Sequence, residues 1–553
     1  FFQAEDGIRD LVRSRGLGDV YKRQQVISPD LTLNRKDHQQ NSGGIAVDNL
    51  MTFDGATLFA IEESPIEAGL IWTGSNDGQI QLSRNGGETW KNVTKNIPNL
   101  PPWGTVSSIH PSKYKKGTAY IAIDLHQMGD FGTYLYKTSD YGMHWKSIVG
   151  DIPQSVHSFA HVLKEDPKKE GMLYLGLDNS LLISIDDGTH WMHLKNNLPP
   201  APIYWLEVQE NYDDLIISTY GRGYYILDDL SPLRQFDPNL KEFPQVFDPR
   251  KSYRLNNKES IKTDGYSFNS GMNPAYGTPI NYYLPDTLTD RVFIEIRDEK
   301  NEIIRTLKGS NNPGINRITW DLRYEPTYKA QLRTRPFGRP WVQLNGEGWR
   351  PLVTWDLDLL SGQYGPRVVP GKYKALINID KVSFEKDLMV LKDPLAQGSL
   401  ADVKEQVQFS LTLREAMNTA VTMINKIEYI RSELLLLQTS LKKNSELKKV
   451  DRLIGIATQI AGSLYDIQLT GAREDAFRSP MKLYGRLSAL ASEINSSGID
   501  FKPTDQQGDV YEILNQRLQK AKRAFNELTI NEIAAFNKTL NDMNMHIDIE
   551  KKM

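Results

Sequence analysis

The sequence predicts a mainly β fold with an α-helical C-terminal domain. Three observations support this prediction: an eight-residue pattern that occurs three times before residue 200, further alternating strands after it, and helical spacing of apolar residues near the C-terminus. The 553 residues are enough for about three domains. We place a set of β-propeller blades at 25–240, a β-sandwich at 246–396 and an antiparallel helical bundle at 397–553.

The composition is that of an ordinary globular protein, with 39% hydrophobic residues, 24% charged residues and a formal net charge of -3. This balance argues against a nucleic-acid partner. The chain has no cysteine, which excludes disulfides, thiolate metal sites and a cysteine nucleophile. It contains no apolar run of about eighteen residues, so no membrane span is expected. No metal or phosphate-loop motif occurs either, and we expect neither a metal nor a cofactor.

Residues 1–24 do not fit the rest of the chain. They start without Met and show neither strand nor helix periodicity. They also lack the basic start and apolar centre of a signal peptide. The stretch resembles translated sequencing adapter, so we expect it to be non-native. On this interpretation the true N-terminus, and any signal peptide, would lie upstream.

The repeated pattern is Ser/Thr-x-Asp/Asn-x-Gly-x-Thr/His-Trp. Its copies start at residues 83, 138 and 184, so they are 55 and 46 residues apart. Each follows an alternating apolar stretch, and the spacing is close to the length of a four-stranded propeller blade. A fourth unit, residues 214–229, has two strands but no copy of the pattern.

Turn chemistry explains these boxes without catalysis. The Asp or Asn can cap backbone N–H groups, the glycine allows positive φ, and the tryptophan packs between sheets. Three copies around a ring cannot share one active site. The residues predicted to be structural are Ser83, Asn85, Gly87, Trp90, Thr138, Asp140, Gly142, Trp145, Ser184, Asp186, Gly188 and Trp191. Asp187 is predicted only to fill its turn.

The boxes resemble the Asp-box, or bacterial neuraminidase repeat, of sialidases, xyloglucanases and sortilin-type propellers. The chain is similar over about residues 26–400 to large bacterial proteins of the glycosyl hydrolase class with sortilin-like propellers. The similar stretches, besides the boxes, are 26–32, 58–65 and 219–235. The resemblance implies a periplasmic, cell-surface or secreted protein and the C-terminal part of a larger propeller.

In such a blade the boxed turns lie at one end, and the turns between the second and third strands lie at the other. The connections from each outer strand to the next inner strand share that second end. We predict a ligand site there, formed by Asp77, Trp103, Asp124, His126, Asp178, Tyr204 and Arg222. Aromatic rings, carboxylates and an arginine suit a glycan or polypeptide ligand. The alternative is that these residues only cap turns and pack at the rim.

Two functions remain open at this point. The first is a propeller that recognises a glycan or a peptide. The second is a glycoside hydrolase, exo-glycosidase or sialidase-like, whose catalytic acids lie partly upstream. Glu62 and Glu63 are possible acids on an inner strand, while His126, His157 and His161 look too scattered for a site. The sequence assigns no catalytic residue and no oligomeric state.

The predicted sandwich resembles the Ig-like modules that accompany such propellers. Its insertion, 325–366, is rich in Gly, Pro, Arg and Trp. Docking of this insertion onto the propeller is the simpler interpretation, and carbohydrate binding through Trp341 and Trp349 is the alternative.

Apolar residues after 397 recur mostly every three or four positions, beginning with Val403, Val407 and Leu411. Four amphipathic helices separated by short polar breaks predict an antiparallel bundle. A coiled coil that dimerises through the first long helix is the alternative.

Overall fold

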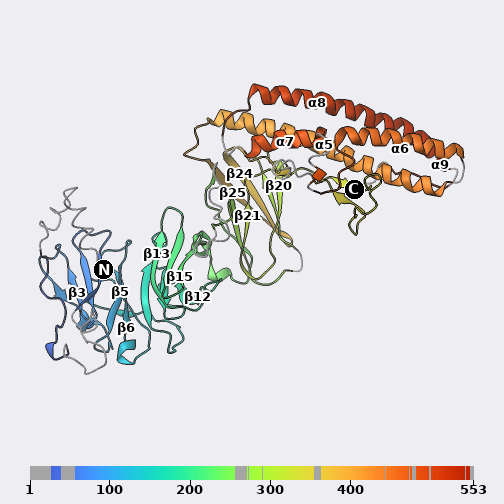
Figure 1. The fold of residues 1–553 in the computed structure, drawn as a ribbon. Helices are drawn as coiled ribbons and strands as arrows, with labels where there is room; N and C mark the ends of the chain where they lie inside the picture. Colours follow the sequence, from blue (N-terminus) through green and yellow to red (C-terminus); the bar gives the residue numbers. More distant parts are fainter. Residues whose placement is uncertain are drawn as a thin grey trace. The chain divides into compact units, whose positions relative to one another are not determined.

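The computed structural model describes residues 26–38, 57–255, 271, 273–288, 291–353, 363–441, 444–472, 474–475, 481–496, 500–541 and 544–548. The segment expected to be adapter, 1–24, lies outside them. The fold is mixed β with a C-terminal helical region, as predicted (Figure 1). The chain forms two compact units, Phe1–Arg234 and Gln235–Met553. Among the described residues, no helix combines the length and the apolar content needed to cross a membrane.

The first unit consists of antiparallel sheets whose strands neighbour one another in chain order, which is the order of a propeller blade. The first sheet contains β1 (Leu58–Glu63), β2 (Ile71–Ser75), β3 (Ile80–Ser83) and β4 (Lys91–Asn92). The second contains β5 (Thr105–Pro111), β6 (Ala119–Asp124), β7 (Tyr134–Thr138) and β8 (Lys146–Ser147). The third contains β9 (Ala160–Glu165), β10 (Leu173–Leu177), β11 (Leu181–Ser184) and β12 (Met192–His193). The fourth has three strands, β13 (Ile203–Gln209), β14 (Asp214–Thr219) and β15 (Gly223–Leu227), and the short helix α3 (Ser231–Gln235) follows.

Apolar cores between consecutive sheets hold this unit together. Trp72 of the first sheet and Trp145 of the second share one core and meet edge to face, with ring centroids 6.0 Å apart. Comparable cores join the second sheet to the third and the third to the fourth. The sheets approach closely: a Cβ added to Gly176 would lie 2.6 Å from the carbonyl oxygen of Ile203. Packing of this kind fixes the ends of the strands relative to one another.

The boxes form one hydrogen-bond pattern three times. The side-chain oxygen of Asn85, Asp140 or Asp186 accepts from the hydroxyl two residues earlier and from the N–H four residues later, at 2.9 to 3.0 Å. The glycines that follow have φ values of 98°, 74° and 81°, which disfavour other residues. Trp145 and Trp191 are buried. This is the capped turn geometry that the residue pattern predicts.

The box glycines also touch the preceding segment of chain. A Cβ on Gly87 would contact Ile27, and one on Gly188 would contact Ile148, which directly follows β8. Trp90 Nε1 donates to the Ile27 carbonyl at 2.9 Å, and Trp191 Nε1 donates to the Ile148 carbonyl at 3.1 Å. Ile27 therefore contacts the box of the first sheet in the same way as Ile148, which follows the outer strand β8, contacts the box of the third sheet.

The prediction for Asp187 was incomplete. Its backbone has a φ of 61°, as a turn requires. Its carboxylate also accepts from the Tyr120 hydroxyl at 2.9 Å and pairs with Lys137 Nζ at 2.5 Å. Both partners lie on the second sheet. Asp187 thus joins neighbouring sheets as well as filling a turn. The residues of a single repeat could not predict these contacts with another sheet.

Two sheets in the second unit share one apolar core, the organisation of a sandwich. One sheet has the order β16 (Gln245–Val246), β18 (Thr278–Leu284), β21 (Gly314–Trp320). The other has the order β17 (Ser252–Arg254), β25 (Val382–Lys392), β24 (Gly371–Ile379), β19 (Phe293–Arg297), β20 (Ile303–Lys308). In the insertion, β22 (Gln331–Leu332) pairs with β23 (Arg350–Pro351). The Ig-like assignment remains a prediction.

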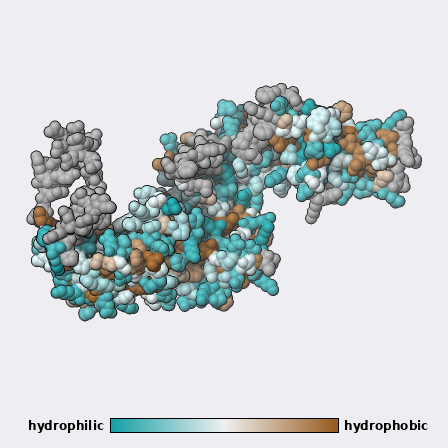
Figure 2. Space-filling model, turned by 60° about the horizontal axis from the view of Figure 1, so that its bottom comes forward, coloured by the Kyte–Doolittle hydropathy of each residue, from teal (hydrophilic) through white to brown (hydrophobic). Residues whose placement is uncertain are grey.

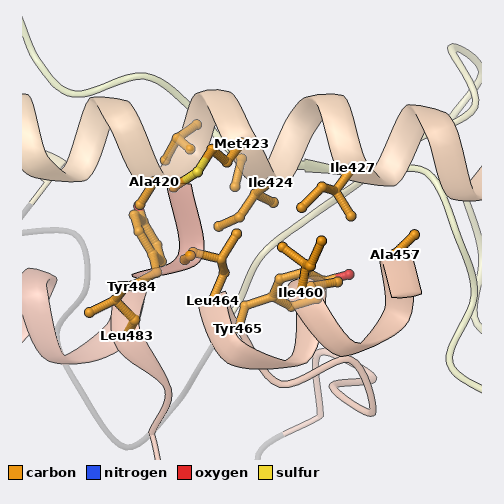
Figure 3. Packing of buried hydrophobic residues seen from close by; sticks show 14 of the residues in the cluster. Ala420, Met423, Ile424, Ile427, Ala457, Ile460, Leu464, Tyr465, Leu483 and Tyr484 are labelled. Atoms are coloured by element: carbon orange, nitrogen blue, oxygen red, sulfur yellow. The ribbon is translucent and has the colours of Figure 1, made fainter. Parts of the chain in front are cut away.

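The helices pack around one apolar core, part of which is drawn in Figure 3. Ala330, Leu332 and Leu352 of the insertion belong to the same core. The helices are α5 (Leu400–Ser440), α6 (Asn444–Leu464), α7 (Leu483–Ser496), α8 (Asp505–Asn526) and α9 (Ala534–Asn541), with a π-helical stretch, Glu527–Ile533, between the last two. Ser399 and Thr504 form capping boxes at the starts of α5 and α8. The apolar side of α5 packs on α6 and α7 of the same chain, so this side is not free for a coiled-coil partner.

The face seen in Figure 2 is mostly hydrophilic, with hydrophobic residues in small areas between the hydrophilic ones. Such scattered apolar residues are normal on folded proteins and need no partner. Hydropathy in this view therefore does not identify a binding surface.

We expect Asp186→Ala to lower the free energy of unfolding by about 1–2 kcal/mol, because the His190 N–H and the Ser184 hydroxyl lose their acceptor. Urea unfolding followed by tryptophan fluorescence measures the change. Asn197→Ala, at an exposed position nearby, is the control and should shift stability by less than about 0.5 kcal/mol. Equal effects of the two substitutions would contradict a structural role for the box.

Candidate functional site

The inner strands of all four sheets in the first unit share one irregularity. There is a β-bulge in each of β1, β5, β9 and β13: one residue of the inner strand has no partner on the neighbouring strand. The extra residues are Phe59, Ser107, His161 and Tyr204. A bulge redirects a side chain, and bulges are frequent beside functional sites. These four lie near the starts of the inner strands, at the end where the sequence predicts the ligand site.

A row of aromatic rings crosses the second, third and fourth sheets at this end. His126 stacks on Phe159, with ring centroids 4.7 Å apart. Phe159 meets His161 edge to face at 5.1 Å, and His161 stacks on Tyr204 at 4.2 Å. Tyr220, which follows β14, lies 5.6 Å from Tyr204. We call these five residues the aromatic row.

Two carboxylates accompany the aromatic row. Both Asp124 oxygens lie 2.7 to 2.8 Å from His126 Nδ1. The Asp178 carboxylate lies 2.9 Å from His157 Nδ1 and 3.5 Å from His161 Nε2. The second contact does not meet the geometry of a hydrogen bond, although Asp178 still favours the charged form of His161. Within the described part of the chain, His161 Nε2 is buried without a hydrogen-bond partner.

Burial dominates the electrostatics of the two stacked rings. It lowers the pKa of His161 below the ordinary value, while Asp124 and then Asp178 oppose this shift. Burial also raises the pKa of Tyr204, and Asp124 and Asp178 add to that effect. His161 is therefore neutral at neutral pH and able to donate or accept one hydrogen bond to a ligand.

The structure brings four of the predicted residues together: Asp124, His126, Asp178 and Tyr204. The histidines, which look too scattered for a site in the sequence, lie near one another: His157 and His161 both face Asp178, and Phe159 contacts the rings of His126 and His161. The loops that carry His157 and Asp178 come from one sheet, but the sequence contains no signal for the direction of each ring.

The other predicted residues lie differently. Asp77 is buried and accepts from the Leu33 N–H at 2.8 Å and from the Ser75 hydroxyl at 2.5 Å, as a capping residue would. Trp103 is half-buried with a φ of 69°. Arg222 is exposed in the turn after Tyr220, between two glycines of positive φ. It lies at the edge of the aromatic row, two residues from Tyr220.

A second layer lies deeper along the same inner strands, three residues after each bulge. Its members are Glu62, His110, Lys164 and Glu207. Lys164 Nζ lies 3.7 Å from Glu62, 3.9 Å from Glu207 and 4.5 Å from the Trp205 ring centroid. Burial and the charge of Lys164 lower the pKa of His110 to about 3. Because a lysine pairs with both carboxylates, neither is a good candidate for a general acid.

Within the described residues, no group of three or more side chains is arranged to hold a metal ion. What the aromatic row and its carboxylates provide is ring surface, hydrogen-bond acceptors and one buried nitrogen with free capacity. This set of groups can bind a ligand that carries both flat apolar faces and hydroxyl or N–H groups.

No protein-family model and no curated protein matches this chain. Solved structures similar to parts of it include YCF48 from Cyanidioschyzon merolae, at 13% identity and a TM-score of 0.23, covering 31% of this chain and 52% of that one. An ancestral GH74 enzyme has 13% identity and a TM-score of 0.26, covering 46% and 32%. The GH74 xyloglucanase from Xanthomonas campestris has 14% identity and a TM-score of 0.25, covering 57% and 47%. The chain thus spans less than two thirds of each, and likeness at this level carries no argument about its activity.

We expect His161 to titrate below the ordinary histidine pKa of 6.5 and His190 above it, because burial disfavours the charged form of His161 and the hydrogen bond that His190 donates to Asp186 favours its charged form. Unfolded His161 binds its proton near pH 6.5, so its burial destabilises the fold as the pH falls through that value. Two-dimensional NMR of the imidazole protons, assigned with His161→Gln and His190→Gln, measures both midpoints. A His161 midpoint at or above that of His190 would contradict the burial argument.

Proposed function

We propose that the first unit recognises a glycan or peptide ligand at the aromatic row. The observation that carries this proposal is His161 Nε2, a buried nitrogen without a hydrogen-bond partner beside an exposed ring surface. Leaving such a group unsatisfied costs about 1–3 kcal/mol. A ligand hydroxyl or N–H at this position would recover that energy.

The neighbouring groups suit the same ligand classes. Tyr204 and Tyr220 are 48% and 72% exposed, so their ring faces are open to a sugar ring or to an apolar side chain. Asp124 and Asp178 supply acceptors, and Arg222 supplies a donor within reach of the turn that carries Tyr220. These groups can hold a ligand without cleaving a covalent bond in it, so they support recognition.

In this proposal the remaining predicted features are structural. The three boxes hold the blades of a sortilin-like Asp-box propeller, and the Ig-like sandwich (246–396) and the helical bundle (397–553) serve as scaffold. A periplasmic, cell-surface or secreted location fits a protein that recognises such ligands. The glycan or polypeptide is the only partner class proposed for this site.

One observation favours the second function, glycoside hydrolysis. Asp124 and Asp178 both act on His161 and on Tyr204, so two carboxylates lie close to one ligand position. A glycosidase needs two such acids across the scissile bond. Each of these carboxylates already contacts an imidazole, Asp124 that of His126 and Asp178 that of His157. A proton donor would therefore have to come from one of those pairs.

Tyr204→Ala should weaken ligand binding about tenfold or more, because it removes the half-exposed ring that lies between His161 and Tyr220 in the aromatic row. An array of oligosaccharides and short peptides identifies the ligand, and isothermal titration calorimetry measures its affinity. Tyr212→Ala, at an exposed tyrosine in the turn between β13 and β14, is the matched control and should bind like the wild type. Unchanged affinity in Tyr204→Ala, with the fold intact, would overturn the site.

Release of product from the bound oligosaccharide, followed by chromatography, separates the two functions. Binding without product supports recognition. Product formation that Asp124→Asn and Asp178→Asn both abolish would establish the hydrolase instead.

A further inference from the structure

The insertion of the second unit is anchored along α5 at regular intervals. The backbone N–H groups of Tyr328 and Gln331 donate to Asn418 and Asn425 at 2.9 and 2.8 Å. Three residues further on, the Thr334 N–H donates to Glu428 at 2.9 Å. The base of the insertion therefore follows the helix.

The last of these anchors is a buried network. Glu428 is fully buried and also accepts from the Thr334 hydroxyl at 2.9 Å and from the Tyr465 hydroxyl at 2.6 Å. Arg431 pairs with the same carboxylate. Breaking a buried, fully bonded carboxylate is costly, so this end of the insertion is held firmly.

The segment beyond this anchor folds back on itself. Strands β22 and β23 pair at its base, and the buried Arg350 donates to the Thr334 carbonyl at 3.2 Å. Arg335 Nε donates to the carbonyl of Val342 at 3.0 Å, and Val342 is buried. Residues 335–342 thus form a compact tip on a rigid base.

Two aromatic side chains project from this tip. Phe337 is 90% exposed, more than any other aromatic residue in the described part of the chain, and Trp341 is 65% exposed. Trp349, the other tryptophan of the insertion, is different: it is half-buried, and its Nε1 donates to Glu347 at 2.7 Å. Two large exposed rings within five residues of a firmly held loop differ from the scattered apolar residues elsewhere, and apolar groups gathered in this way are typical of interaction surfaces.

The charged residues next to these rings in the sequence are basic. Residues 326–346 contain Lys329, Arg333, Arg335 and Arg339, and the nearest acidic residues in the sequence are Glu325 and Glu347, which flank the stretch. A local excess of arginine attracts an anionic partner, and guanidinium groups bind phosphate particularly well.

We propose that residues 335–342 dock the protein on an anionic phospholipid surface. Phe337 and Trp341 enter the interfacial layer, and Arg335 and Arg339 meet the headgroup phosphates. Protruding rings fit this role better than they fit a saccharide site, because sugars bind in concave sites with polar groups beside the ring. This surface is separate from the aromatic row of the first unit, and it requires no membrane-spanning segment.

The test is flotation of the full chain with vesicles of equal parts phosphatidylcholine and phosphatidylglycerol, against pure phosphatidylcholine, at two salt concentrations. The wild type should bind the anionic vesicles and lose binding at high salt. Phe337→Ala should weaken binding about tenfold, from the apolar area lost, and Arg339→Gln about fivefold, from one basic contact. Leu395→Ala removes another strongly exposed apolar residue and should bind like the wild type.

Circular dichroism and the unfolding midpoint of each variant show that the fold is intact. Absence of vesicle binding by the wild type, or equal binding by Phe337→Ala and Arg339→Gln, would overturn the proposal. Retention on immobilised alginate without binding to vesicles would also overturn it, and would assign the loop to an acidic polysaccharide. If no ligand binds at the aromatic row, the vesicle and alginate results still stand, because the aromatic row lies in the first unit.

Discussion

Contact between each box glycine and an earlier segment of the chain is the constraint on which the first unit depends. Gly188 sits where a side chain would collide with Ile148, and Trp191 bonds the Ile148 carbonyl from the same turn. The same few residues therefore form the turn and pack one sheet against the next. The boxes lie at one end of the first three sheets, and the bulges of the inner strands lie at the other end.

At that other end, the four bulges determine which side chains a ligand would contact. Without the extra residue, the side chain of His161 or Tyr204 would follow the ordinary alternation of its strand. The bulge brings the two rings into a stack and places a histidine nitrogen beside Asp178 without a proper bond to it. A small local irregularity, repeated on each inner strand, thus creates the site, and the Lys164 layer below it stays ion-paired.

The second unit uses buried polar groups differently. Glu428 and Arg254 each lie deep in the structure, and each ties one part of the unit to another: Glu428 joins the insertion to α5, and Arg254 joins β17 to Gln406 and to Asp500 before α8. Such bonds orient segments that apolar packing alone would leave free to shift. The exposed tip of the insertion can be rigid because its base is held in this way.

The order of the strands, the capped turns and the long helices could be predicted because their causes are local. A hydroxyl, an Asp or Asn, a glycine and a tryptophan within eight residues determine a turn, and apolar spacing with Ser399 or Thr504 as a cap determines where a helix begins. The ends at which loops collect follow from strand order alone, and so the sequence could predict that Asp124, His126, Asp178 and Tyr204 lie at the same end of their sheets. The stacking of Phe159, His161 and Tyr220 into the aromatic row was not predicted, and Asp77 is buried with hydrogen bonds to Leu33 and Ser75. Those outcomes depend on bulges and on contacts between sheets whose residues lie 33 to 43 positions apart in the chain. Only the tertiary structure decides them, because the direction of a side chain at a bulge depends on what packs against it and not on its neighbours in sequence.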